Sequence, residues 1–214
     1  MGNFNKGILQ ENISFLKGKG YTEKLIVDSI DELIELANET GYQPSDLIDV
    51  RIAKKNDLDF SGIKMFIMDC DGVLTDGGMS FTENGDEIKR FNVKDGMGIK
   101  MLQKNDVVTA IISAGVNKNV VKHRGEMLGI DHVYIGKRPK LEVLAEWLLD
   151  LNIDYSEIAY IGDDINDIPV MEKVGYSFCP QDAVSAVKNV VDLVLPVKGG
   201  QGCIRALVDQ YFSY

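Results

Sequence analysis

Five aspartates offer the chemistry that is easiest to identify in this chain. Asp69 and Asp71 are separated by one residue, so in extended backbone both carboxylates point to the same side. Asp163, Asp164 and Asp167 form a second acidic group. Neighbouring carboxylates repel one another unless a cation or a proton lies between them, and their oxygen atoms suit a hard divalent cation, Mg²⁺ first. Aspartate at a helix N-terminus is the plain alternative for one such loop, but two loops favour a metal site.

Short apolar runs separated by amphipathic stretches must position these carboxylates. The runs predicted as strands are 65–68, 107–112, 133–135, 158–161, 176–178 and 193–195. The stretches predicted as helices lie near 97–105, 117–128, 139–151, 183–190 and 203–212. This alternation predicts an α/β fold, a Rossmann-like parallel sheet with helices on both faces. One segment breaks the alternation, since residues 79–91 alternate polar and apolar around Asn84-Gly85 and predict a β-hairpin.

The residues that follow the predicted strands are polar and complementary in charge. Asp69 and Asp71 follow the first strand, and Ser113 follows the second. Lys140 lies at the start of the helix after the third strand, and Asp163 follows the fourth. Ligands of an open parallel sheet bind beyond the carboxyl ends of its strands, so we expect these side chains to meet at one edge. A helix-capping serine and a surface lysine are the alternatives for Ser113 and Lys140 taken alone.

Residues 1–60 differ from the rest and are predicted to form a small helical extension of unknown role. One helix is expected over 22–40, with Gly41 as its stop, and a short helix over 44–52. The apolar face expected of the first helix consists of Leu25, Ile26, Ile30, Leu33, Ile34 and Ala37. The polar run 54–57 is expected to be a linker. The predicted domains are therefore 1–60 and 61–214.

Composition and charge exclude several classes of function. The chain has 214 residues, with 33 Asp plus Glu against 23 Lys plus Arg and a net charge of −10. So acidic a chain is poorly suited to bind nucleic acid or an anionic membrane through its overall charge. The N-terminus lacks the apolar stretch of a signal peptide, and the longest apolar stretch is too short to cross a bilayer. We therefore expect a cytoplasmic protein. Its three widely spaced cysteines predict neither a disulfide framework nor a CxxC metal site.

The order of these motifs resembles that of a known family. The stretch from Asp69 to Gly77, then Ser113, Lys140 and the stretch 162–167, are similar to the four motifs of the haloacid dehalogenase superfamily of phosphotransferases. The resemblance covers about residues 61–214. Stretches 69–78, 91–99 and 199–202 are further similar to the capless branch of that superfamily, which dephosphorylates sugar acids of the octulosonate and nonulosonate kinds.

The resemblance implies a Mg²⁺-dependent phosphatase that forms an aspartyl-phosphate intermediate. In such an enzyme Asp69 is the nucleophile, and Asp71 protonates the leaving alcohol and then activates water. Ser113 hydrogen-bonds the phosphoryl oxygens, and Lys140 offsets the negative charge. The implied metal ligands are Asp69, Asp163 and the backbone carbonyl of Asp71. Asp164 and Asp167 bind the metal directly or through water, or orient Lys140.

The resemblance also implies which residues contact the substrate, a phosphorylated 2-keto-3-deoxy sugar acid. Gly72 allows the backbone to approach the phosphate. Asn92 and Arg124 match positions of the branch, and Arg205 is a candidate partner for the substrate carboxylate. Solvated arginines in exposed helices are the alternative for the last two.

The expected assembly is a homotetramer. In the branch, hairpins pack together in place of a cap domain, and a C-terminal tail reaches a neighbouring subunit; residues 199–202 resemble the flexible start of that tail. This chain departs from the branch at 113–116, which reads Ser-Ala-Gly-Val where relatives have Thr-Gly and a charged residue, so the sugar stays open. A phosphatase for another small phosphometabolite, and a non-catalytic assembly or regulatory module that kept the fold, are the alternatives.

Overall fold

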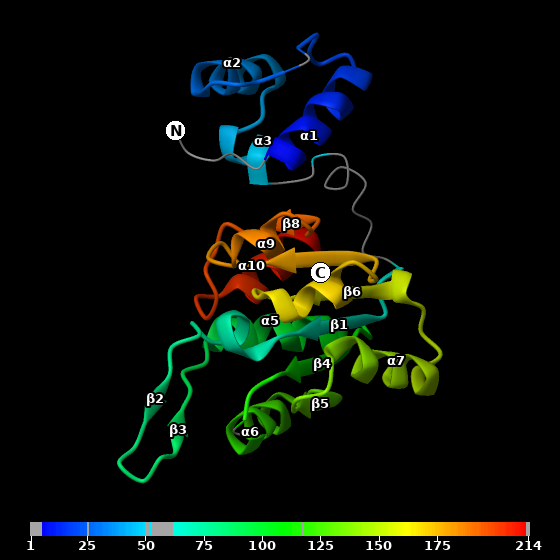
Figure 1. The fold of residues 1–214 in the computed structure, drawn as a ribbon. Coiled ribbons are helices and arrows are strands. Elements are labelled where there is room, and N and C mark those ends of the chain that lie inside the picture. The colour runs from blue at the N-terminus through cyan, green and yellow to red at the C-terminus, as the bar shows by residue number, and fades with distance from the viewer. Residues whose placement is uncertain (1–5, 25, 50–51, 53–61, 117, 213–214) are drawn as a thin grey trace. The chain divides into compact units, whose positions relative to one another are not determined.

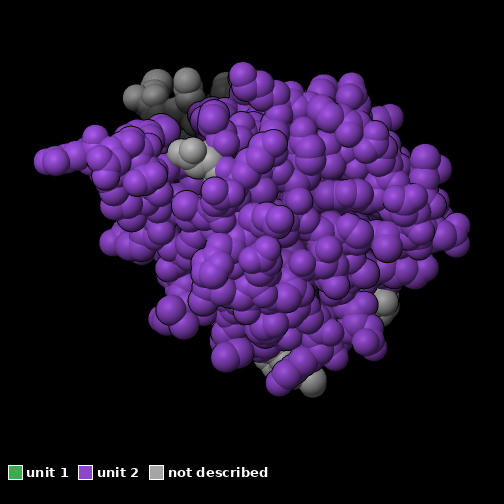
Figure 2. All heavy atoms as spheres, turned by 90° about the horizontal axis from the view of Figure 1, so that it is seen from below, with its two compact units in different colours: residues 1–58, 192–194 green, residues 59–191, 195–214 purple. Residues whose placement is uncertain are grey.

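The computed structural model describes residues 6–24, 26–49, 52, 62–116 and 118–212. The chain divides into two compact units: residues 1–58 with 192–194, and residues 59–191 with 195–214. The face drawn in Figure 2 belongs to the second unit. None of the described helices is both long and apolar enough to cross a membrane.

A six-stranded sheet in the order β5-β4-β1-β6-β7-β8 is the central element of the fold (Figure 1), and all of its strands except β8 belong to the second unit. Its strands are β1 (Met65–Met68), β4 (Val108–Ser113), β5 (His132–Ile135), β6 (Ile158–Ile161), β7 (Tyr176–Cys179) and β8 (Leu193–Val194). β1 pairs in parallel with both β4 and β6, with Met68 beside Ile111 and Ile161. All residues of β1 and β6 are buried, which fits the continuous apolar runs expected of central parallel strands. The predicted α/β fold is confirmed.

Helices flank the sheet on both faces (Figure 1). They are α5 (Val93–Lys104), α6 (Lys118–Leu128), α7 (Lys140–Leu151), α8 (Ile168–Met171), α9 (Ser185–Lys188) and α10 (Cys203–Tyr211). α5 begins four residues before the predicted start at 97, because Asn92 caps it and its two early glycines, Gly96 and Gly98, weaken the helical pattern. The prediction omitted α8 and made α9 too long.

The segment between β1 and α5 is the predicted hairpin. β2 (Ser80–Phe81) pairs antiparallel with β3 (Glu87–Ile88), with Ser80 opposite Ile88. Gly85 takes a positive φ of 84° in the connecting turn, as expected for the Asn-Gly signal. The hairpin projects from the second unit (Figure 1) and leaves Phe81 and Ile88 more than half exposed.

The described part of the first unit forms the helices α1 (Lys6–Gly18), α2 (Ile30–Thr40) and α3 (Pro44–Asp49). Buried apolar side chains, among them Leu16, Leu36 and Leu47, form its own hydrophobic core. The prediction missed α1 and extended α2 too far toward the N-terminus. α2 begins after Ser29, which forms a reciprocal capping box with Glu32.

The predicted apolar face of α2 is also partly wrong. Leu33 and Ala37 are buried as expected, whereas Ile26, Ile30 and Ile34 are 64%, 57% and 45% exposed. Ile26 lies before the helix, and Ile30 and Ile34 lie to one side of the buried face that Leu33 and Ala37 form. Thr22, expected to cap this helix, instead hydrogen-bonds the Glu39 side chain. Leu25 and the predicted linker 54–57 lie outside the described residues.

Candidate active site

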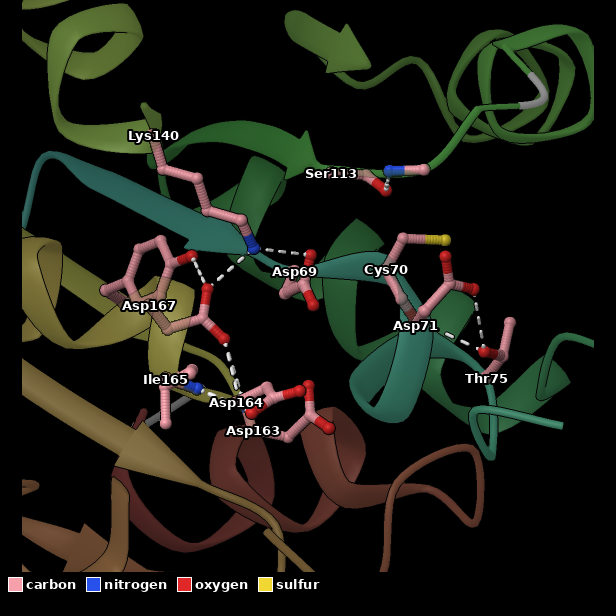
Figure 3. A network of polar contacts seen from close by, with 12 residues as sticks. Asp69, Cys70, Asp71, Thr75, Ser113, Lys140, Asp163, Asp164, Ile165 and Asp167 are labelled. Carbon is pink, nitrogen blue, oxygen red and sulfur yellow. Dashed lines mark hydrogen bonds and ion pairs between the residues drawn. The ribbon is translucent and has the colours of Figure 1, made fainter. Parts of the chain in front are cut away.

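Adjacent strands bring the predicted polar residues to one edge of the sheet. β1, β4 and β6 are neighbours, and each is followed by part of the site. Asp69 and Asp71 lie in the loop after β1, residues 69–75, which we call the β1 loop. Ser113 ends β4, Asp163 follows β6, and Lys140 is the first residue of α7. Figure 3 shows Asp69, Lys140, Asp163 and the nearby Asp167 converging from these elements.

Lys140 is buried between two carboxylates. Its Nζ atom lies 2.7 Å from Asp69 Oδ1 and 2.6 Å from Asp167 Oδ1. Burial alone would lower the pKa of Lys140, but these carboxylates outweigh burial and the pKa is raised. The Tyr160 hydroxyl donates to the same Asp167 oxygen at 2.5 Å. Lys140 therefore keeps its positive charge beside Asp69, and the surface-lysine alternative is wrong.

Asp167 uses both oxygens within the protein. Oδ1 accepts from Lys140 and Tyr160, and Oδ2 accepts the backbone N–H groups of Asp163 and Asp164 at 2.9 and 3.2 Å. Asp167 is completely buried. These contacts hold the loop after β6 and orient the lysine.

Asp69, Asp163 and Asp167 present carboxylate oxygens that all lie within 4.8 Å of one another. Burial raises the pKa of Asp69 to about 6 and that of Asp163 to about 8, and neighbouring carboxylates add to both rises. Asp163 Oδ1 is buried, and within the described residues it has no hydrogen-bond partner. A buried, unpaired carboxylate oxygen is costly, and a hard cation would satisfy it. The cluster thus fits Mg²⁺.

Gly72 preserves the space around Asp163. Its φ is +88°, and an added Cβ would lie 2.0 Å from Asp163 Oδ2. A side chain at position 72 would therefore collide with the acidic cluster as well as strain the backbone. Glycine is required here on both counts.

Asp71 and Asp164 do not join the three-carboxylate cluster through their side chains. Asp71 Oδ1 lies 2.5 Å from Lys89 Nζ. The same carboxylate accepts a hydrogen bond from Thr75 Oγ1, as Figure 3 shows. Asp164 Oδ1 accepts the backbone N–H of Ile165 at 2.7 Å and caps the short helix that follows. The capping interpretation thus holds for Asp164.

Lys89 was not identified from the sequence, although it is a central residue of the site. Its Nζ atom bridges Asp71 and Glu87, at 2.5 and 2.8 Å, and its side chain is 5% exposed. Glu87 and Lys89 are two apart in the second half of the hairpin, so they share a side. The polar and apolar alternation of the hairpin was therefore the sequence signal that could have identified Lys89. Tyr160 was also missed, because a tyrosine within an apolar strand looks like a core residue.

Ser113 is buried at the end of β4, where its Oγ accepts the backbone N–H of Gly115 at 3.1 Å. An added Cβ at Gly115 would lie 3.2 Å from Ser113 Oγ and 3.4 Å from Asp71 Oδ2. Ser113 and Asp71 therefore face the same small space across this glycine.

A pocket of about 470 Å³ extends from Lys89 to the side of α6. Arg124 lines it with its guanidinium 5.5 Å from the centre of the Phe91 ring, and His123 lies beside it. Arg124 Nη2 also donates to the backbone carbonyl of Asn92 at 3.3 Å. The pocket therefore places basic groups next to the partner of Asp71, in an otherwise acidic chain.

Arg205 and Asn92, both predicted to contact the substrate, do not line the pocket beside Lys89. Arg205 Nε pairs with Asp209 at 2.7 Å, one turn along α10. Asn92 caps α5, and its Nδ2 donates to the Gly200 carbonyl at 3.2 Å. Residues 199–202, expected to be the flexible start of a tail, form instead a packed turn directly before α10. Its close approach to the β1 loop explains the difference, since a Cβ at Gly199 would lie 1.9 Å from Gly72 O.

Comparison with known proteins identifies the family to which this chain belongs. Residues 130–207 match the family described as haloacid dehalogenase-like hydrolase. The chain is 42% identical over 147 residues to 3-deoxy-D-manno-octulosonate 8-phosphate phosphatase of Escherichia coli K12, which covers 69% of this chain and 78% of the relative. The Haemophilus influenzae enzyme of the same name is 41% identical over 69% of this chain and 81% of its own. The chain therefore belongs to the haloacid dehalogenase-like hydrolases, and the predicted family and enzyme class are confirmed.

Solved structures show the same relationship within that family. The phosphatase of Moraxella catarrhalis, described as a complex with magnesium ion, phosphate ion and KDO, is 32% identical with a TM-score of 0.68, covering 71% of this chain and 87% of that one. A HAD superfamily (subfamily III A) hydrolase from Legionella pneumophila is 38% identical with a TM-score of 0.70, covering 74% and 87%. These two structures share the fold of this chain over 71% and 74% of its length.

Proposed function

We propose that this protein is a Mg²⁺-dependent phosphatase that hydrolyses the phosphomonoester of a 2-keto-3-deoxy sugar acid of the octulosonate or nonulosonate type. The observation that carries the proposal is the buried Asp69 carboxylate, with Lys140 on one side and the acidic cluster on the other. The similarity to octulosonate phosphate phosphatases, one of them described with magnesium, phosphate and KDO, supports the substrate class.

In the proposed reaction Asp69 attacks phosphorus and forms an aspartyl-phosphate. Lys140 offsets the charge that gathers on Asp69 and the phosphoryl oxygens, and Ser113 donates a hydrogen bond to one of those oxygens. Asp71 delivers a proton to the leaving alcohol and then removes one from the attacking water. Lys89 holds the Asp71 side chain beside this space.

Asp69, Asp163 and the backbone carbonyl of Asp71 would hold the magnesium ion. The ion supplies positive charge that allows an anionic carboxylate and an anionic phosphate to approach each other. Asp167 orients Lys140, because both of its oxygens already accept hydrogen bonds within the protein. Asp164 contributes through the loop that it caps, with any metal contact through water.

The pocket beside Lys89 is the proposed site for the rest of the substrate. Arg124 offers a guanidinium for the sugar carboxylate, and Asn92 positions Arg124 through its backbone carbonyl. Gly72 lets the backbone approach the phosphate. Arg205 pairs with Asp209 here, so it would have to leave this ion pair to bind the substrate carboxylate.

Assembly and location follow the same proposal. The exposed apolar residues of the hairpin and its approach, Met79, Phe81 and Ile88, suit packing against other copies in a homotetramer. We place the phosphatase domain at 61–214 and the helical extension at 1–60. A cytoplasmic location without nucleic-acid or membrane partners agrees with the net charge of −10.

The test is phosphate release from a panel of octulosonate and nonulosonate phosphates and common sugar phosphates, with and without Mg²⁺. We expect the wild-type protein to release phosphate from a sugar acid phosphate only when Mg²⁺ is present, and the Asp69→Asn variant to release no phosphate. Preference for another phosphate ester would indicate a phosphatase for a different metabolite. If no ester is hydrolysed by the folded wild-type protein, a non-catalytic module is the better interpretation.

A further inference from the structure

Asp95 has no role in the proposed chemistry, yet it is almost completely buried. It lies in the first turn of α5 and is 1% exposed. Its Oδ1 accepts the backbone N–H of Arg205 at 3.1 Å. Burial raises the pKa of the Asp95 carboxyl, while the backbone N–H groups of Arg205, Ile204 and Gly202 act in the opposite direction. All three N–H groups belong to the start of α10, so Asp95 faces the beginning of another helix.

The start of α10 needs an acceptor that its own sequence does not provide. The first N–H groups of a helix lack partners within the helix, and a side chain at the N-cap usually supplies one. Here the N-cap is Gly202, at φ +99°. Asp95 takes that role from α5, and Gly98 allows the close approach, since an added Cβ would lie 3.1 Å from the Arg205 Cα.

The turn before α10, residues 199–202, rests directly on the β1 loop. The Gly200 N–H donates to the Val73 carbonyl at 2.8 Å. The Cys203 Sγ atom lies 3.4 Å from the same carbonyl oxygen. An added Cβ at Gly199 would lie 1.9 Å from the Gly72 carbonyl oxygen. The turn therefore fixes the backbone of Gly72 and Val73 from outside.

α5 holds this turn on both sides. Asn92, the N-cap of α5, donates to the Gly200 carbonyl at 3.2 Å, and Asp95 holds Gly202 and Arg205 one turn further along. The backbone that this turn contacts is that of Gly72 and Val73. Its position matters for the site, because Gly72 lies against Asp163 and directly follows Asp71. A path of direct contacts thus leads from α5 through the turn to the acidic cluster.

We propose that Asp95 is a positioning residue for the phosphatase: by capping α10 from α5 it fixes the turn 199–202 against the β1 loop and so places Gly72 and Val73 beside the cluster. The part that concerns catalysis rests on the proposed function. The part that concerns the β1 loop stands on the contacts alone.

The experiment compares Asp95→Ala, the conservative Asp95→Asn, and Asp131→Ala as a matched control. Asp131 also accepts a backbone N–H, that of Thr109 at 2.9 Å, but it does so near the amino end of β4, at the opposite end of the strands from the site. Amide hydrogen exchange is measured at Gly200, which donates to Val73, and at Thr75, which donates to Cys70 at 3.0 Å. Steady-state kinetics with Mg²⁺ are measured on the same samples.

For Asp95→Ala we expect exchange at both amides to be about tenfold faster, as for the loss of a helix cap, and kcat to fall more than KM changes. Asp95→Asn keeps the Oδ1 acceptor and should restore both. Asp131→Ala should lower the melting temperature without either effect.

The inference is overturned if Asp95→Ala exchanges faster within α10 while Thr75 and kcat stay as in the wild type, or if Asp131→Ala reproduces the pattern. If the alanine variant does not fold, Asp95→Asn decides the question. Exchange at Gly200 and Thr75 as slow as in the wild type would then support the capping role, and fast exchange at Gly200 without a change at Thr75 would refute it. A wild-type protein that releases no phosphate would refute the proposed function, and the exchange results would still decide the role of Asp95.

Discussion

Replacing Gly72 by alanine tests whether the metal cradle depends on the missing side chain. The new Cβ would lie 2.0 Å from Asp163 Oδ2 and 2.4 Å from its Cγ. Contacts this short cannot exist, so the Asp163 carboxylate must move out of the acidic cluster. We therefore expect Gly72→Ala to lose Mg²⁺ binding while the protein remains folded.

The magnitude follows from two separate costs. An L-residue in the left-handed region costs about 1–2 kcal/mol, which lowers stability with or without metal. Changes around a bound metal typically lower its affinity about 10- to 100-fold, and loss of a carboxylate ligand belongs at the upper end. Mg²⁺ at a hundred times its Kd stabilises the wild type by about 2.7 kcal/mol. A hundredfold weaker site leaves about 0.4 kcal/mol at the same concentration.

The assay is the shift in melting temperature on adding Mg²⁺, with phosphate release measured in parallel. At about 2–4 °C per kcal/mol for a chain of this length, the wild-type shift of about 5–10 °C should fall to about 1 °C. Gly77→Ala is the matched control, because Gly77 has φ +74° but its Cβ would meet its nearest atom at 3.6 Å. It should lose stability and keep the shift. A wild-type shift in Gly72→Ala, or an equal loss in Gly77→Ala, would refute the reasoning.

Three other outcomes can be measured. In the folded protein the pKa of Asp69 is about 6 and that of Asp163 about 8, and both lie above the values in the unfolded chain. The metal-free protein should therefore lose stability as the pH rises through these pKa values, because the folded state then has to release protons that it binds more tightly. The affinity for Mg²⁺, measured by calorimetry, should rise over the same range, and an affinity that is flat from pH 6 to 8 would contradict this. Lys140→Met leaves Asp69 and Asp167 without their cation and should cost about 3 kcal/mol in urea unfolding without metal, together with all phosphate release; a fully active variant would exclude the assigned role. Tyr160→Phe removes one donor to Asp167 and should cost about 1–2 kcal/mol with Mg²⁺ binding retained, and an unchanged unfolding midpoint would show that the bond adds nothing.

The part of the fold that sequence predicted well is the part in which apolar pattern and burial coincide. β1 and β6 are completely buried, so their apolar runs had one interpretation, and the residues that follow them had to lie at one edge. α2 shows where the approach fails. Ile26, Ile30 and Ile34 continue its apolar pattern but are exposed, and pattern alone could not show which of two apolar faces turns inward.

The candidate site divides in the same way. The residues that lie in the β1 loop, at the end of β4 and after β6 could be placed from strand order alone. Lys89 could not, because its position depends on how the hairpin folds back toward Asp71. The packed turn at 199–202 could not be distinguished from a flexible one, since glycine permits both, and only the distance to Gly72 decides between them.

Lys89 gives the hairpin a mechanical connection to the proposed proton donor. The cation beside Asp71 is carried by a projecting two-stranded element whose outer side chains, Phe81 and Ile88, are exposed. A partner that packs against those side chains also restricts Lys89, which directly follows Ile88 in the chain, and therefore affects the charge that Asp71 faces. Specific activity should then depend on protein concentration, with dilution below the assembly range slowing each active site and not merely reducing their number.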